Sequence, residues 1–203
     1  KNAEAEGIKV NPQVYKYKTI KIETDAVYLN ETELEVIRKL DLSKRPGLDN
    51  ARDLFLIMCY TGLRFSDIQK LKIDHFSSDM RFINIHQKKT GGKLRIPVHY
   101  IVNEIVTKRN GLPHIISNVK LNVYIKDICE LAKIDDPVFI QSYKNGLRVE
   151  EKKAKYKLVT VHTARRSFAT NMYKSKQLTV QEIMLFTGHK TEASFFRYIK
   201  VTK

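Results

Sequence analysis

Hydrophobic side chains recur at helical spacing along most of the chain, beginning near Tyr28. This periodicity predicts helices over residues 31–40, 49–60, 100–109, 118–132, 161–174, 180–187 and 192–200. The helix over 49–60 is apolar on nearly all sides, so we expect it to lie at the centre of the fold.

Residues that commonly cap helices flank several of these segments. The expected caps are Asn30 with Glu33, Ser117, and Thr179 with Glu182 at helix starts, and Gly62 and Gly111 at helix ends. These signals fix where the helices should begin and end, because capping groups satisfy the unpaired backbone groups of the terminal turns.

In two places the pattern changes to the alternation that is typical of strands. Segments 81–86 and 93–98 alternate around a basic, glycine-rich tip, which predicts a β-hairpin. A second hairpin is possible where 138–143 and 147–149 flank Asn145-Gly146, a strong turn signal. The lysine-rich segment 152–157 is expected to be a loop.

The sequence therefore predicts an α+β protein, mainly helical, with a small antiparallel sheet. Residues 1–27 are polar with weak alternation, so we interpret them as a linker or arm, followed by one compact domain over 28–203. The chain starts at Lys1 without a methionine, so we expect it to be a fragment with further sequence on its N-terminal side.

The net charge of the chain limits the classes of partner that the protein is expected to bind. Among 203 residues, 37 are Lys or Arg and 22 are Asp or Glu, which gives a net charge of +15. Such an excess favours a polyanionic partner, and nucleic acid is the first candidate. No apolar run is long enough to span a bilayer, and no secretory signal is visible. Cys59 and Cys129 lie in apolar helical patterns and should be buried thiols, so we expect an intracellular protein.

Cationic groups gather near two predicted helix ends. His162 and Arg165, three residues apart near a helix start, could bind a phosphate together with the free amides of that end. Arg64 follows the glycine that ends a buried helix, and Asp67 could hold its guanidinium in place for bidentate phosphate binding. A satisfied surface histidine and a structural Arg–Asp pair are the alternatives.

Two further groups matter only in combination. Lys88, Lys89 and Lys93 surround the hairpin tip, where a lysine could reach a groove and donate a proton, although most such turns are merely solvated. Near the C-terminus, His189 follows Gly188, and Tyr198 lies in the last helix. A phenol needs nearby cations or a base to become a nucleophile, and a lone tyrosine among phenylalanines is more often a core residue.

The order and spacing of these motifs resemble the catalytic set of the tyrosine recombinases, the phage integrase family. The similarity spans about 28–203 and is carried by Gly-Leu-Arg-Phe-Ser-Asp around Arg64, Lys89 on its hairpin, His-Thr-Ala-Arg-Arg-Ser-Phe-Ala-Thr from His162, Gly188-His189, and Tyr198. Asp67 stands where glutamate is more usual in the family, and Arg166 stands where histidine is frequent.

The resemblance implies a reaction and a role for each residue. Tyr198 would attack a DNA phosphodiester to form a 3′-phosphotyrosyl link and free a 5′-hydroxyl, while Arg64 and Arg165 bind the phosphate. His162 would assist proton transfer, His189 would hydrogen-bond the phosphate, Lys89 would protonate the leaving oxygen, and Asp67 would orient Arg64. Lys88, Lys93, Arg166 and Arg197 are expected to contact DNA.

The resemblance also implies partners. We expect double-stranded DNA, a monomer in isolation and a homotetramer on paired sites, with no metal, ATP or other cofactor and no membrane. Residues 1–27 would be the linker from an N-terminal DNA-binding domain, and the protein would act in the cytoplasm at the nucleoid, for a mobile genetic element. A non-catalytic basic DNA-binding module and a type IB topoisomerase-like enzyme are the alternatives.

Overall fold

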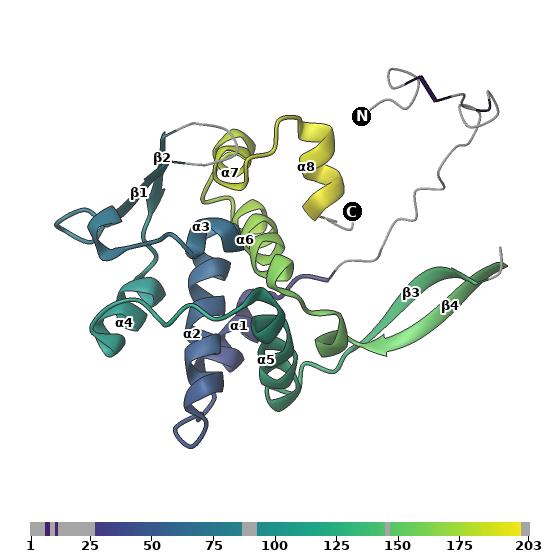
Figure 1. Ribbon diagram of the computed structural model, residues 1–203, viewed down its shortest axis with the longest axis horizontal. Coiled ribbons are helices and arrows are strands. Elements are labelled where there is room, and N and C mark those ends of the chain that lie inside the picture. Colours follow the sequence, from purple (N-terminus) through teal and green to yellow (C-terminus); the bar gives the residue numbers. More distant parts are fainter. Residues whose placement is uncertain (1–6, 9–10, 12–26, 87–92, 145–146, 200–203) are drawn as a thin grey trace. The chain divides into compact units, whose positions relative to one another are not determined.

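The computed structural model describes residues 7–8, 11, 27–86, 93–144 and 147–199 (Figure 1). The chain divides into two units, which are considered separately. The larger unit comprises Ala26–Val138 and Lys152–Lys203, and the smaller comprises Lys1–Asp25 and Phe139–Glu151. All of the candidate catalytic residues lie within the larger unit, and most of residues 1–27 lie outside the described residues.

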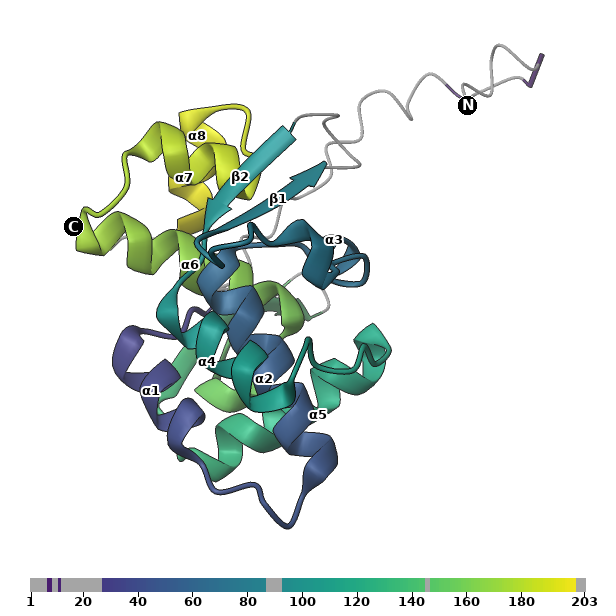
Figure 2. The ribbon, with the colours of Figure 1, turned by 90° about the vertical axis from the view of Figure 1, so that its left-hand side faces the viewer.

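Helix α2 (Pro46–Thr61) forms the centre of the larger unit. Every residue from Ala51 to Thr61 is buried, and the helix packs against α1, α4, α5 and α6 (Figures 1 and 2). It ends at Gly62, whose φ of 65° lies in the left-handed region. A Cβ at Gly62 would come within 2.5 Å of the Phe168 ring, so glycine is required both by the backbone and by the packing.

The remaining elements follow in chain order. They are α1 (Glu31–Lys39), α3 (Phe65–Ile68), η3 (Ile73–His75), β1 (Phe82–His86), β2 (Lys93–Pro97), α4 (Tyr100–Arg109), α5 (Asn118–Leu131), β3 (Pro137–Lys144), β4 (Leu147–Ala154), η4 (Lys155–Leu158), α6 (Val161–Ser175), α7 (Val180–Thr187) and α8 (Glu192–Ile199). The described chain is thus mainly helical with two small antiparallel sheets, as the hydrophobic pattern predicts.

Most local predictions are confirmed. The capping box of Asn30 and Glu33 starts α1, the Ser117 side chain caps α5, and Thr179 with Glu182 starts α7. Strands β1 and β2 pair antiparallel with Ile83 opposite Ile96, and these alternating apolar residues point into the core. Cys59 and Cys129 are buried free thiols, as expected.

Three local predictions are wrong. The segment after residue 152 is not a loop, because β4 continues to Ala154 and η4 follows directly. Asn110, not Gly111, adopts the left-handed conformation that ends α4, with φ of 50°. Helix α2 begins at Pro46 rather than residue 49, since proline fits the first helical position where no amide hydrogen is needed.

The last three helices form a layer that carries the C-terminal motifs. A small apolar cluster joins them, made of Ala169 from α6, Ile183 from α7, and Phe195 and Ile199 from α8. All four side chains are essentially buried, so α8 is anchored beside α6 and α7 (Figures 1 and 2). This packing holds Tyr198, which lies between the two α8 anchors in sequence, near α6.

Two kinds of feature are absent from the described residues. No helix among them is long and apolar enough to cross a membrane. Within the same residues, no group of three or more His, Cys, Asp or Glu side chains is arranged to hold a metal ion.

Candidate active site

Arg64 lies just after the end of α2, and this position places its side chain in the site. After the Gly62 cap, Leu63 is fully buried and Arg64 adopts an extended backbone as the N-cap residue of α3. Its guanidinium reaches the turn after α7, where a Cβ at Gly188 would lie 3.0 Å from Nη2 and 3.4 Å from Nη1. The same Cβ would lie 3.6 Å from Nη2 of Arg165, so both arginines flank one glycine.

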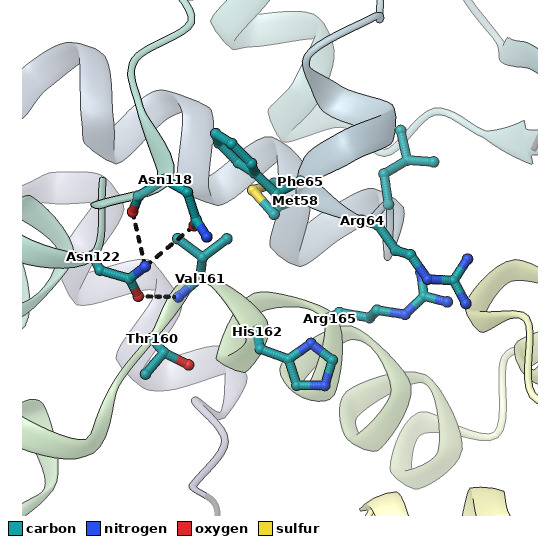
Figure 3. Close-up of a pocket in the computed structure, with 10 residues that line it drawn as sticks. Met58, Arg64, Phe65, Asn118, Asn122, Thr160, Val161, His162 and Arg165 are labelled. Atoms are coloured by element: carbon teal, nitrogen blue, oxygen red, sulfur yellow. Dashed lines mark hydrogen bonds between the residues drawn. The ribbon is translucent and has the colours of Figure 1, made fainter. Parts of the chain in front are cut away.

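Arg165 lies on α6 and is only 4% exposed (Figure 3). Its Nη1 donates to the carbonyl oxygen of Gly62 and its Nη2 donates to that of Thr187, so it bridges the C-terminal ends of α2 and α7. Helix C-termini favour cations, which explains how this charge is accommodated. Burial and then the neighbouring Arg64 lower the pKa of Arg165 to about 10, so the group is still charged at neutral pH.

The expected contact between Asp67 and Arg64 is not formed. In the part of the chain that the structure describes, no hydrogen bond or ion pair joins them, and Asp67 Oδ2 is buried without a hydrogen-bond partner. The Asp67 carboxylate acts instead on Arg165, whose pKa it raises in opposition to burial. The reason is geometric, because the Arg64 side chain is directed toward Gly188 rather than back along α3.

Tyr198 lies among groups from α6 and the α7–α8 turn. The His162 ring meets its ring edge-on at a centroid distance of 5.3 Å, and the His189 ring is tilted at 4.7 Å. The Tyr198 hydroxyl is buried and has no hydrogen-bond partner among the described residues. Burial raises the pKa of Tyr198, while the positive charges of Arg165, Arg166 and Arg64 act in the opposite direction.

His189 is held in one tautomer by its neighbour. The Thr187 hydroxyl donates its single proton to the Ile183 carbonyl at 2.6 Å, so in the 2.8 Å contact with His189 the ring Nδ1–H is assigned as the donor. The neutral ring therefore presents an unprotonated Nε2. Desolvation, followed by the charges of Arg165 and Arg64, lowers the pKa of His189 to about 4.

His162 is also neutral near pH 7, although it is more exposed than His189. Partial burial of the ring lowers its pKa, and the charges of Arg166, Arg165 and Arg64 lower it further. A neutral imidazole beside a phenol can accept its proton. The site thus combines fixed positive charge with neutral bases, an arrangement suited to binding an anion and ionising a hydroxyl.

Comparison with known proteins identifies the family. The sequence matches the phage integrase family over residues 28–203. The chain belongs to the phage integrase family. A comparison with curated proteins gave no match.

Solved integrase and recombinase structures share this fold. A lambda integrase fragment, crystallised as a dimer bound to a COC′ core site, has a TM-score of 0.67 at 18% identity and covers 98% of this chain and 68% of its own. XerA recombinase has a TM-score of 0.61 at 17% identity, and the match covers 98% of this chain and 66% of the XerA chain. The Tn1549 transposon integrase in complex with circular intermediate DNA has a TM-score of 0.57 at 15% identity, and the match covers 99% of this chain and 70% of the Tn1549 chain. The chain spans about half of one XerH recombinase structure and two thirds of XerA.

A pocket of about 400 Å³ adjoins the arginines in this integrase-family fold (Figure 3). Its lining includes two residues that sequence reasoning missed, Asn118 and Asn122 on α5. Asn122 Oδ1 accepts the Val161 amide at 2.9 Å and its Nδ2 donates to the Asn118 carbonyl at 2.8 Å. The sequence signal for these residues was the pair of asparagines four residues apart at the start of α5. It was not sufficient, because the Val161 amide that Asn122 binds lies 39 residues further along the chain.

The expectation of free amides at the start of α6 is only partly met. The Val161 amide is taken by Asn122, and the Thr163 amide donates to the Thr160 carbonyl at 2.9 Å. An anion bound at this end of α6 would therefore depend mainly on side chains.

The remaining predicted residues have different outcomes. Lys88 and Lys89 lie outside the described residues, and for Lys93 only the backbone at the start of β2 is described. Arg197 is exposed on α8. The guanidinium carbon of Arg166 lies over the Tyr198 ring, 4.7 Å from the centroid, and contact of Arg166 with DNA stays a prediction.

Proposed function

We propose that this phage integrase family member is a site-specific DNA recombinase in which Tyr198 attacks a DNA phosphodiester. The observation that carries the proposal is the pairing of Arg64 and Arg165 around Gly188, with Tyr198 held nearby on α8. Two adjacent guanidinium groups repel each other, and an anion between them would relieve that repulsion. A DNA phosphate is the anion that the net charge of +15 favours.

In the proposed cleavage step, each of these side chains has one role. Tyr198 Oη bonds to phosphorus as the bond from phosphorus to O5′ breaks, which gives a 3′-phosphotyrosyl link and a 5′-hydroxyl. Arg64 and Arg165 stabilise the charge on the non-bridging oxygens, and positioned cations act more strongly in a site from which water is excluded. His162, neutral in this environment, accepts the phenol proton.

The leaving oxygen needs a proton of its own. In this proposal Lys89, which lies between β1 and β2 in the sequence, supplies it, as the family resemblance implies. His189 hydrogen-bonds the phosphate, for which the ring proton must move from Nδ1 to Nε2 when DNA binds. Joining then reverses these steps with the 5′-hydroxyl of a partner strand. One phosphodiester replaces another of similar energy, so the reaction requires no ATP, and the arginines provide the charge stabilisation that a metal provides in other phosphoryl transfers.

The same proposal extends to partners. A lambda integrase has been crystallised as a tetramer bound to a Holliday junction, with a TM-score of 0.64 to this chain. We infer that this protein likewise binds duplex DNA and assembles as a tetramer on paired sites, with residues 1–27 as an arm from a DNA-binding domain. Exchange for a mobile element, at the nucleoid of a prokaryotic cell, is the corresponding biological role.

A nicked duplex carrying the DNA that flanks the gene provides the test, because loss of the short cleaved strand traps the covalent intermediate. We expect an SDS-resistant protein–DNA adduct from the wild type and none from Tyr198→Phe, with DNA binding retained in both. Tyr173→Phe is the matched control, since Tyr173 lies in the same aromatic cluster, against Phe195 and Phe196. It should form the adduct normally.

Two other results of these experiments would support a different function. Salt-dependent binding without any adduct on the correct site would indicate a passive DNA-binding module, with a slope of about −0.9 per phosphate neutralised. Relaxation of supercoiled plasmid without exchange between two sites would indicate a topoisomerase of type IB.

A further inference from the structure

Arg166 makes an unusual contact with the proposed nucleophile. Its guanidinium carbon lies 4.7 Å from the centroid of the Tyr198 ring. Arg166 Nε and Nη1 are buried, and neither has a hydrogen-bond partner among the described residues. The Tyr198 hydroxyl is likewise buried without a partner. The Arg166 guanidinium therefore lies over the Tyr198 ring, with polar atoms of both side chains buried.

This contact requires a physical explanation. Burying a guanidinium without full hydrogen bonding is costly, and burial lowers the pKa of Arg166 accordingly. A planar, weakly hydrated guanidinium is nevertheless the cation best suited to stack on an aromatic face. The Tyr198 ring is thus a major compensating partner of Arg166, and the two side chains fix each other.

We propose that Arg166 is a positioning residue that holds the Tyr198 ring in the active site and keeps a positive charge beside its hydroxyl as the proton leaves. The inference rests on the proposed function of Tyr198 as nucleophile. It replaces the sequence-based expectation that Arg166 contacts DNA.

The other charges near Tyr198 explain why a third arginine is useful. Arg64 and Arg165 act on the hydroxyl as well, but in the proposed reaction both bind the phosphate, whose negative charge offsets theirs. His162 and His189 are neutral near pH 7. Because Arg166 lies over the Tyr198 ring and is not assigned to the phosphate, we expect its charge to remain beside the forming phenolate after DNA has bound.

The first test measures the phenol itself and needs no DNA. Protein labelled with 3-fluorotyrosine would be titrated by ¹⁹F NMR, with Tyr198→Phe identifying the Tyr198 signal. We expect Arg166→Met to raise the Tyr198 pKa by about one unit, because a nearby positive charge is lost. Arg166→Lys keeps a charge and should recover at least half of the change. Arg45→Met is the matched control, since Arg45 is exposed in the α1–α2 connection, away from α8 (Figures 1 and 2).

The second test measures adduct formation on the nicked duplex as a function of pH. Arg166→Met should slow cleavage at least about tenfold near neutral pH, with the deficit shrinking as the pH rises, because the phenolate then forms without assistance. DNA affinity should stay within about twofold of wild type. Arg166→Lys should be intermediate, and Arg166→Gln provides a second neutral variant in case the methionine variant does not fold.

The outcomes separate the two proposals. Unchanged Tyr198 titration and unchanged cleavage in folded neutral variants would overturn the role of Arg166 and leave the proposed function intact. Weakened DNA binding with a smaller salt slope and an unchanged Tyr198 pKa would restore the DNA-contact interpretation. If wild type formed no adduct, the proposed function would fail, while the NMR titration would still report whether Arg166 acts on Tyr198.

Discussion

The guanidinium of Arg64 lies against the backbone of Gly188, where a Cβ would come 3.0 Å from Nη2. Gly188 ends α7 with φ of 58°, a left-handed conformation that side chains rarely adopt. The glycine therefore serves two purposes, since it turns the chain toward His189 and leaves room for the arginine pair.

Gly188→Ala should damage the site more than the fold. The added methyl group would displace Arg64 and strain the left-handed turn, which costs about 1 kcal/mol of stability. We expect adduct formation to fall at least about tenfold, because a misplaced phosphate ligand no longer matches the transition state. Gly47→Ala is the control, since its Cβ would make only ordinary contact with Tyr124 at 3.5 Å. It lies in α2 and should be neutral or stabilising by up to about 1 kcal/mol.

The two arginines that we propose to bind the phosphate should behave differently when replaced. Arg64→Ala removes no hydrogen bond within the described chain, so we expect a stable protein with adduct formation reduced about 100-fold and DNA affinity reduced far less. Arg165→Ala leaves the Gly62 and Thr187 carbonyls without their donor and should also lower the melting temperature. Equal losses of affinity and cleavage in Arg64→Ala would contradict its assignment to the transition state.

Ser167 ties the start of the domain to the helix that carries His162 and Arg165. Its hydroxyl accepts the buried Leu29 amide at 2.8 Å, and Asn171 Nδ2 donates to the Leu29 carbonyl at 3.1 Å. Ser167→Ala should cost about 1–3 kcal/mol in urea unfolding, because the amide remains buried without an acceptor. Ser175→Ala, exposed at the end of the same helix, should change stability by less than about 0.5 kcal/mol. A cost for Ser167→Ala no larger than this control would contradict the tie.

Stability should fall as the pH decreases from about 6.5 toward 4. His189 has a folded pKa of about 4 and an unfolded value near 6.5, so the unfolded chain binds more protons in this window. The loss attributable to His189 is about 1–2 kcal/mol, since solvent screens a partly exposed ring. Urea unfolding of His189→Gln should show a shallower dependence between pH 6.5 and 5. The exposed His114→Gln is the control and should retain the wild-type dependence.

The sequence by itself determined the helices, their caps and the family. Hydrophobic periodicity and caps such as Asn30 and Gly62 act over a few residues, so they can be read without knowledge of the packing. The ordered motifs from Arg64 to Tyr198 were sufficient to indicate the family, which the match over residues 28–203 confirms. The errors at Pro46, Asn110 and the end of β4 concern element boundaries, where local signals compete.

Only the tertiary structure decided which groups meet. Arg165 joins carbonyls 103 and 22 residues away, and Arg166 lies over the Tyr198 ring. Asp67 stays apart from Arg64 although three residues separate them. These relationships depend on how α2, α6, α7 and α8 pack, because side-chain direction at a site is set by the buried faces of several helices together. The sequence thus specified the chemical groups of the site, and packing between distant segments specified their partners.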